Sequence, residues 1–184
     1  MVHLRSDEAL VARAQRGDRD AFDELVRRHR DRVYAVVLRL TRNPSDAEDA
    51  LQDAFLNAYR ALHRFDRRAR FSTWLHRIAT NAAFDVISRR RTSRTLDGDG
   101  VPEQASPGDP FVQAGQRRAL EAALAALPDD YRAAVLLCDV AGLGTGEAAV
   151  ALDLPEGTVK SRVFRARALI AQALREPSNV DAVQ

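Results

Sequence analysis

Apolar side chains return every three or four residues along most of the chain, and no segment alternates apolar and polar positions for long. This spacing places the apolar residues on one face of an α-helix rather than on one face of a β-strand. In the N-terminal half it predicts a first helix that Gly17 stops, followed by helices over about residues 20–41, 43–64 and 72–91. Asn43 and Pro44 suit the N-cap and the first turn of the third helix. The pattern therefore predicts an all-α fold.

The helical pattern stops between residues 92 and 109, where Gly, Pro, Ser and Asp are frequent and large apolar residues are nearly absent. Such a segment buries too little apolar surface to offset its ordering entropy, so we interpret it as a flexible acidic linker. Helical spacing resumes at about residue 110 and continues to about residue 176, and residues 177–184 are expected to be a disordered tail. The chain is thus predicted to form two small helical domains, residues 1–91 and 110–176, joined by the linker 92–109.

The chain has 28 basic and 26 acidic residues, so its net charge is only +2. A net charge this small indicates no class of partner, and only the distribution of the charges along the chain is informative. The one cysteine, Cys138, allows no internal disulfide, and four scattered histidines with one thiol make a poor metal set. The sequence has no membrane-length apolar run and no signal-peptide pattern, so a cytoplasmic protein without direct membrane contact is expected. It also lacks a Gly-rich phosphate loop and a Ser/His/Asp set, so neither an enzymatic activity nor a cofactor is expected.

The C-terminal domain carries the pattern of a helix-turn-helix. A short helix near residues 147–152 is followed by a turn at Asp153 and by a longer basic helix over about residues 155–175. Gly144 serves as N-cap of the short helix, with Glu147 at its third position, and Asp153 can adopt the left-handed conformation of the turn. Val159, Val163 and their apolar neighbours share the inward face of the last helix, so its cationic face points outward and suits a DNA major groove.

Each polar residue type on the outward face suits a contact with DNA. Arg165 can donate two hydrogen bonds to guanine, Ser161 can read either a donor or an acceptor, and Phe164 can press on a thymine methyl group. Thr158 near the helix N-terminus suits a phosphate, and neighbouring cations add attraction that is independent of base sequence. The alternative for a basic helix is a merely solvated face, but an exposed phenylalanine between cations favours DNA binding.

Two stretches of the C-terminal domain make the pattern more specific. LPEGTVKSRVFRARALI resembles region 4 of the extracytoplasmic-function (ECF) sigma factors, and PDDYRAAVLLCDVAGL is similar to the helix that precedes it. The resemblance implies contacts with duplex DNA at the −35 promoter element by Thr158, Lys160, Ser161, Arg162, Phe164 and Arg165. The family usually has an aromatic residue near Thr145 and a larger aliphatic residue at Ala148, so this chain departs from it in the short helix.

Two stretches of the N-terminal domain, SDAEDALQDAFLNAYRAL and FSTWLHRIATNAAFDVISRRR, resemble region 2 of the same family. The first is expected to form a helix with an acidic stripe. By itself this stripe is consistent with a solvated face. Next to a basic domain it suits binding of a cationic protein surface. The resemblance implies that this helix docks on the clamp helices of the largest subunit of core RNA polymerase, through Asp49, Gln52, Asp53 and Leu56. It also implies that region 4 meets the β flap of the polymerase.

The second stretch and the loop before it combine arginines with interleaved aromatic residues. A protein that binds a single DNA strand requires cations along the sugar-phosphate backbone and aromatic rings that hold the unpaired bases. Phe71 and Trp74 are equally consistent with core positions, and core is the better interpretation for Trp74. The resemblance implies contacts with the melted −10 element, with a flipped base held at about residues 65–71, and the candidate residues are Phe65, Arg68, Phe71, Trp74, Arg77 and Asn81.

Together these features predict a sigma factor that directs core RNA polymerase to promoters, and the resemblance implies that an anti-sigma factor holds it inactive. Two other functions remain open. A helix-turn-helix regulator would bind an operator alone as a symmetric dimer, but the sequence shows no dimerisation helix. A sigma-like decoy without DNA reading would be consistent with a weakened short helix around residues 144–148.

Overall fold

The computed structural model of the chain describes residues 6–97 and 113–175, and these two ranges contain helices and loops but no strand. The N-terminal part comprises α1 (Asp7–Ala14), α2 (Arg19–Thr41), α3 (Pro44–Ala61) and α4 (Phe71–Asp97). The C-terminal part comprises α5 (Gln113–Ala126), α6 (Asp129–Val135), α7 (Thr145–Leu152) and α8 (Glu156–Arg175). The predicted all-α class is confirmed. Residues 98–109 of the predicted linker and the predicted tail 177–184 lie outside the described residues.

Helices α2, α3 and α4 pack on one another to form the N-terminal bundle, and α1 packs on α2. Their ends follow the sequence signals. Asn43 caps α3, its Oδ1 accepting a hydrogen bond from the backbone N–H of Asp46 at 3.0 Å. Gly17 adopts a φ of 92°, which favours glycine and ends the α1 turn. α4 continues to Asp97, six residues beyond the predicted end, because no proline or glycine interrupts residues 92–97.

The C-terminal part packs α6, α5 and α7 around α8. α6 ends in a π-helical turn over Leu136–Val140, whose first two leucines are buried. The turn between α7 and α8 passes through Asp153 at φ 55° and ψ 47°, which is the predicted left-handed conformation. Gly144 is the N-cap of α7, and its N–H donates to Oε2 of Glu147 at 3.0 Å. Ala148 is fully buried, so its small side chain sets how closely α7 approaches its neighbours.

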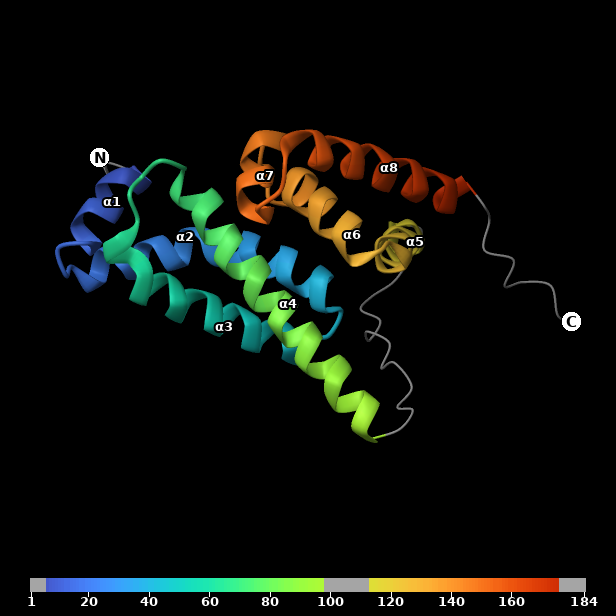
Figure 1. The fold of residues 1–184 in the computed structure, drawn as a ribbon, viewed down its shortest axis with the longest axis horizontal. Coiled ribbons are helices and arrows are strands. Elements are labelled where there is room, and N and C mark those ends of the chain that lie inside the picture. Colours follow the sequence, from blue (N-terminus) through green and yellow to red (C-terminus); the bar gives the residue numbers. More distant parts are fainter. Residues whose placement is uncertain (1–5, 98–112, 176–184) are drawn as a thin grey trace, which may run out of the picture.

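The two parts lie against each other (Figure 1). α7 packs on α4, while α5, α6 and the π-helical turn approach α2. Buried apolar residues of both parts belong to one continuous core. α8 lies on the outside of this assembly, away from α3 (Figure 1). Within the described ranges, no helix combines the length and apolarity needed to cross a membrane.

Candidate polymerase and nucleic-acid interfaces

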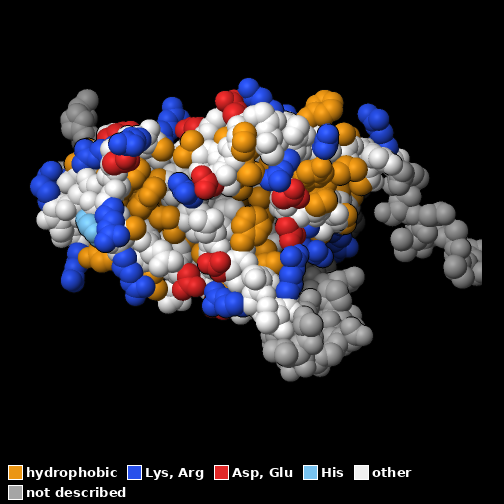
Figure 2. Space-filling view, in the orientation of Figure 1, with side chains coloured by type: hydrophobic (Ala, Val, Ile, Leu, Met, Phe, Trp, Pro, Cys, Tyr) orange, Lys and Arg blue, Asp and Glu red, His pale blue; other side chains and the backbone are white. Residues whose placement is uncertain are grey.

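Basic side chains are spread along the whole visible face of the molecule, with acidic and apolar side chains between them (Figure 2). No single cationic block dominates this face, which agrees with the small net charge of +2. Any recognition of an anionic ligand on it must therefore come from the local arrangement of side chains on individual helices. The predicted sites place three such arrangements on α3, on α4 with its preceding loop, and on α8.

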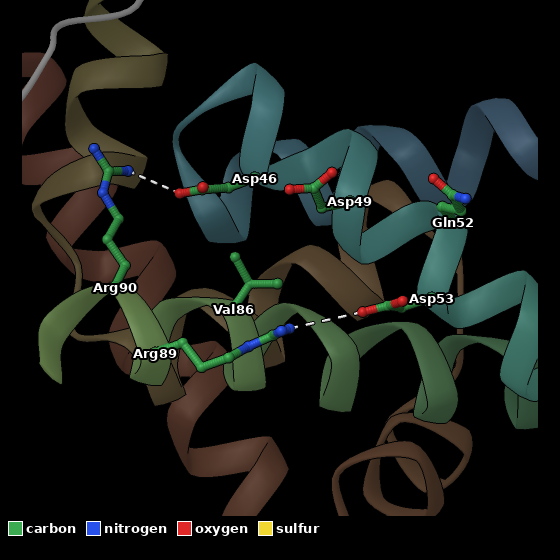
Figure 3. A pocket seen from close by; sticks show the side chains of 7 residues that line it. All are labelled: Asp46, Asp49, Gln52, Asp53, Val86, Arg89 and Arg90. Atoms are coloured by element: carbon green, nitrogen blue, oxygen red, sulfur yellow. Dashed lines mark hydrogen bonds and ion pairs between the residues drawn. The ribbon is translucent and has the colours of Figure 1, made fainter. Parts of the chain in front are cut away.

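The α3 site is an open groove between α3 and α4 (Figure 3). Two arginines of α4 reach across it. Arg90 pairs with Asp46 at 2.9 Å, and Arg89 lies 3.7 Å from Asp53. Asp49 is exposed and forms no ion pair among the described residues. Of the two predicted carboxylates, Asp49 and Asp53, Asp49 is therefore the more available to an external cation.

An apolar edge continues the α3 site away from the groove. Leu56 is 44% exposed, and Tyr59, three residues later on the same face, is 48% exposed. The Tyr59 ring also makes an edge-on contact with Phe22, with ring centroids 5.0 Å apart. Sequence reasoning missed Tyr59, although its spacing from Leu56 places it in the same stripe. The helix thus offers an acidic segment followed by an exposed apolar one, with Gln52 exposed between Asp49 and Asp53 of the acidic segment.

The loop before α4 folds around a cluster of aromatic rings. Phe65 and Phe71 are buried, and the Phe65 and Trp74 rings lie 4.8 Å apart. Trp74 is half-buried at the edge of this cluster. The burial of the two phenylalanine rings favours a role in shaping the loop, whereas the indole of Trp74 retains an accessible edge.

The polar members of the −10 site lie outside the aromatic cluster. Arg68, Arg77 and Asn81 are exposed, and Arg77 and Asn81 are four residues apart, so they share one face of α4. Arg68 pairs with Asp66 at 3.0 Å within the loop. The structure therefore brings a ring edge, two guanidinium groups and one amide to the same end of α4 and its loop.

The α8 site has the two faces that the sequence predicts. Val159, Val163 and Ala166 are buried, whereas Phe164 is 75% exposed. Lys160, Ser161 and Arg165 are also exposed, and Thr158 and Arg162 are half-buried. A large apolar ring this exposed between cations is unusual for a solvated helix face and suits contact with another molecule.

Neighbouring residues hold several of the α8 side chains. The Ser161 hydroxyl donates to the Thr158 carbonyl at 2.9 Å, and Arg165 Nη1 donates to the Tyr131 hydroxyl at 3.4 Å. Arg162 pairs with Asp130 at 3.1 Å, so part of its charge is already neutralised by α6. Lys160 pairs with Glu156 at 2.9 Å.

Glu156 also joins the start of α8 to the start of α7. Its carboxylate accepts a hydrogen bond from the Thr145 hydroxyl at 3.0 Å. The bonds from Lys160 and Thr145 lower the pKa of Glu156. Thr145, which stands where the family usually has an aromatic residue, thus makes a polar link between the two helices of the helix-turn-helix.

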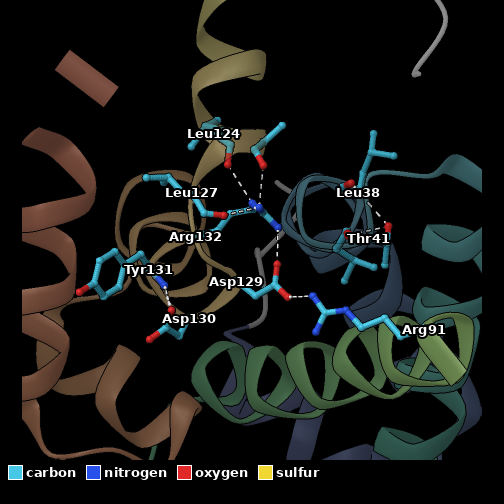
Figure 4. Close-up of polar contacts among 11 residues, drawn as sticks. Leu38, Thr41, Arg91, Leu124, Leu127, Asp129, Asp130, Tyr131 and Arg132 are labelled. Carbon is cyan, nitrogen blue, oxygen red and sulfur yellow. Dashed lines mark hydrogen bonds and ion pairs between the residues drawn. The ribbon is translucent and has the colours of Figure 1, made fainter. Parts of the chain in front are cut away.

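α6 supports the α8 site through a buried guanidinium group (Figure 4). Arg132 is 3% exposed and donates to the backbone carbonyls of Leu124 and Ala125, both at 2.8 Å, and to that of Leu127. It also pairs with Asp129 at 2.8 Å. Burial lowers the pKa of Arg132, and Asp129 opposes that change. These bonds fix α5 to α6 and so hold Asp130 and Tyr131 beneath α8.

Among the described residues, no group of three or more His, Cys, Asp and Glu side chains is placed to hold a metal ion. Cys138 is half-buried, and burial raises the pKa of its thiol, which disfavours the reactive thiolate.

Family comparisons cover both parts of the chain. The model described as Sigma-70 region 2 matches residues 25–93, and the one described as Sigma-70, region 4 matches residues 117–170. ECF RNA polymerase sigma factor SigM of Mycobacterium tuberculosis is 41% identical over 172 residues, which are 94% of this chain and 86% of the relative. ECF RNA polymerase sigma-E factor of Escherichia coli is 37% identical over 182 residues, covering 92% of this chain and 95% of the relative.

Two solved structures share the arrangement of most of the chain. CnrH in complex with the cytosolic domain of CnrY aligns with a TM-score of 0.72 at 28% identity, covering 94% of this chain and 99% of CnrH. The sigma factor RpoE of Bartonella quintana, in complex with the anti-sigma factor NepR, aligns with a TM-score of 0.71 at 28% identity. That alignment covers 85% of this chain and 98% of the other. Both similar structures are therefore complexes with a second protein.

Proposed function

The chain belongs to the ECF family of RNA polymerase sigma factors, and from this premise we propose which of its surfaces perform each step of transcription initiation. As a sigma factor it directs RNA polymerase to promoters. Binding of core polymerase is assigned to α3, reading of the −35 element to α8, and capture of the melted −10 strand to α4 with its preceding loop. The chain needs no cofactor and no catalytic group of its own for these steps, and it acts in the cytoplasm.

The observation that carries the proposal is the exposed face of α8. Phe164 projects from this face between Lys160 and Arg165, while the opposite face is buried in the C-terminal core. In a major groove, Arg165 donates two hydrogen bonds to a guanine, Ser161 bonds a neighbouring base, and Phe164 contacts a thymine methyl group. Arg162, Lys160 and Thr158 meet phosphates, which set the register without selecting the sequence.

The α4 site suits a strand that is already unpaired. Asn81 and Arg77 lie one helical turn apart, so the amide reads a base edge while the guanidinium group follows the backbone. The loop that contains Arg68 closes over the aromatic cluster of Phe65, Phe71 and Trp74. A base that flips out of the stack is held against this loop, which stabilises the open promoter at a cost of a few kcal/mol for unstacking.

The α3 site suits a basic protein surface. Asp49 supplies an exposed carboxylate, Asp53 a partly neutralised one, and Gln52 and Leu56 extend the surface. Docking there fixes the distance between the two DNA-reading sites. Two weak readers on one rigid support bind more tightly than either alone without any new contact. The β flap of the polymerase holds the C-terminal part in the same assembly.

An anti-sigma factor completes the proposal. Both CnrH and RpoE, which resemble this chain over nearly their whole lengths, are complexed with a second protein, in the case of RpoE the anti-sigma factor NepR. We assign a partner of the same kind to this chain. The well-formed α7, with its Glu147 cap and its buried alanines, supports an intact DNA reader rather than a decoy.

Run-off transcription tests the proposal. Core polymerase is supplied with the chain on a promoter with a GGAAC-like −35 element, and a specific transcript is expected. Arg165→Ala and Asn81→Ala should each reduce it by roughly tenfold or more, since a good base contact is worth about 1–3 kcal/mol. Arg167→Ala is the matched control on α8, because Arg167 pairs with Asp139 within the C-terminal part at 2.6 Å. Equal loss in Arg165→Ala and Arg167→Ala would contradict the assignment of α8.

A further inference from the structure

A single side chain joins the end of α1 to the loop that precedes α4. Gln15, the C-cap residue of α1, donates its side-chain amide hydrogens to the backbone carbonyls of Leu62 at 3.0 Å and Phe65 at 2.9 Å. Its Oε1 accepts a hydrogen bond from Nη2 of Arg67 at 2.6 Å. Carbonyls only accept and a guanidinium group only donates, so all three bonds require the same orientation of the amide. Neither a carboxylate nor an ammonium group at this position could make all three.

The backbone that carries Gln15 is fixed by the turn between α1 and α2. Asp18 caps α2 by accepting a hydrogen bond from the Ala21 N–H at 3.1 Å, and it also pairs with Arg13 of α1 at 2.6 Å. Val11, which is 1% exposed, anchors the body of α1 in the bundle. The end of α1 is therefore a rigid support from which Gln15 reaches the loop.

The loop itself contains a strained residue. Arg67 has a φ of 63°, in the left-handed region that is unfavourable for a residue with a side chain. Phe65 is anchored twice, because its ring is buried and its carbonyl accepts from Gln15. The backbone N–H of Arg68 donates to Oδ1 of Asp66 at 3.1 Å, while the Arg68 side chain is 89% exposed. A strained conformation persists only where its surroundings determine it, and such strain clusters at functional sites.

We propose that Gln15 is a positioning residue for the −10 strand, because it holds the loop over residues 62–68 in the conformation against which the flipped base is bound. Gln15 needs no contact with DNA for this role. A loop that must become ordered during binding weakens that binding, whereas a loop ordered beforehand avoids the cost. The inference rests on the proposed −10 function of this loop. It gives α1, which lies outside the three proposed sites, a part in promoter opening.

The test combines two measurements on variants of the full chain. Gln15→Met nearly keeps the length of the side chain but removes all three bonds, and Gln15→Glu keeps the bond from Arg67 but loses both donors. The matched control is Ser6→Ala. It removes the N-cap of α1, whose Oγ accepts from the Ala9 N–H at 3.3 Å, and so weakens α1 without removing a bond to the loop.

The first measurement reports the state of the loop without DNA. Trp74 is the only tryptophan of the chain, and its ring lies 4.8 Å from that of Phe65. In the free chain, both Gln15 variants should make Trp74 more accessible to fluorescence quenching by acrylamide, because the loop that packs on it is loosened. Ser6→Ala should leave the quenching as in the wild type.

The second measurement uses the holoenzyme on a promoter fork with an unpaired −10 strand, through which an abasic site is stepped. In the wild type, loss of the flipped base should weaken binding at least about fivefold at one position, since stacking of one base contributes this much. With either Gln15 variant the same abasic site should weaken binding less than about twofold, whereas Ser6→Ala should keep the wild-type penalty. A smaller folded fraction would change both affinities alike and leave their ratio unchanged.

The outcomes separate this inference from the proposed function. Equal weakening of intact and abasic forks by Gln15→Met would indicate a merely structural role and overturn the inference. Loss of the base preference in Ser6→Ala would also overturn it, because the effect would then come from the stability of α1. If the wild type directs specific transcription and prefers the intact fork, but Gln15→Met keeps that preference, only the inference fails. If the wild type prefers no base at any position, the proposed −10 function of the loop fails, and the inference with it.

Discussion

At the residue scale, Arg132 shows how one buried charge holds the C-terminal part together. Its guanidinium group satisfies three backbone carbonyls at the end of α5 and pairs with Asp129 at the start of α6. Asp129 in turn pairs with Arg91 of α4 (Figure 4). The group is planar with five donors, so no shorter or single-point cation can make all these bonds. The link from α4 through Asp129 to α5 therefore depends on an arginine at this position.

We predict that Arg132→Lys lowers the free energy of unfolding by about 3 kcal/mol, because several buried carbonyls lose their hydrogen-bond donors and Asp129 loses its guanidinium partner. Urea denaturation measures the loss. Arg167→Lys is the matched control, since Arg167 pairs with Asp139 at an exposed site, and it should cost less than about 1 kcal/mol. Similar losses in the two variants would show that the buried network contributes no more than the exposed pair.

His76 gives a prediction for pH. Its ring is 1% exposed, and burial, with smaller effects of His29 and Arg32, lowers its pKa from 6.5 to about 4. Between these values the unfolded chain binds a proton that the folded chain does not, so stability is complete above about pH 6.5 and falls toward pH 4. The loss from this group reaches on the order of 3 kcal/mol near pH 4.

The measurement compares wild type with His76→Gln, which keeps a polar side chain but cannot titrate in this range. Urea denaturation at pH 7 and pH 5 should show that the wild type loses about 2 kcal/mol more than the variant. Parallel losses in the two proteins would mean that His76 is not kept neutral by burial.

The roles of single residues were predictable from the sequence where local backbone geometry determines them. The Asn43 cap, the Gly144 cap and the left-handed Asp153 are confirmed, because each is a local property of three or four residues. Phe65 and Phe71 show the limit of such reasoning. An aromatic residue in a basic loop is consistent with base stacking or with a core, and only the packing of α4 against the loop shows that both rings are buried.

At the element scale, α8 separates stability from recognition on its two faces. Val163 and Phe164 are neighbours in sequence, yet the first is 5% exposed and the second 75%. Helical periodicity was sufficient to predict this division, because the apolar stripe of α8 is regular. It did not predict the π-helical turn after α6, whose continuous apolar run is equally consistent with a regular helix.

We predict that Phe164→Ala impairs DNA binding but not stability, whereas Val163→Ala impairs stability. Phe164→Ala should change the free energy of unfolding by less than about 0.5 kcal/mol and weaken binding of the holoenzyme to a −35 duplex. Val163→Ala should cost about 1–2 kcal/mol of stability through lost burial and the remaining cavity. Thermal unfolding and electrophoretic mobility shift assays measure the two properties. A large loss of stability in Phe164→Ala would place its ring in the core instead.

At the scale of the whole molecule, the packing of the two parts was beyond sequence reasoning. The sequence indicated two helical domains and a linker, but the contacts between α4 and α7 join residues far apart in the sequence, such as Thr73 and Glu147, which are 74 positions apart. No periodicity along the chain encodes such a pairing. Glu147 reads locally as a helix cap, and its second contact becomes visible only when the two parts are placed side by side.

We expect the chain to load onto core RNA polymerase through α3, and equilibrium binding of the labelled full chain to core polymerase tests this docking. Saturable binding is expected, and Asp49→Lys should weaken it about tenfold, since reversing one charge in a complementary interface opposes docking. Asp31→Lys, at a 96% exposed carboxylate of α2, should bind as the wild type does. Absence of binding by the wild type would contradict the sigma function itself, and equal affinities of the two variants would contradict docking through α3.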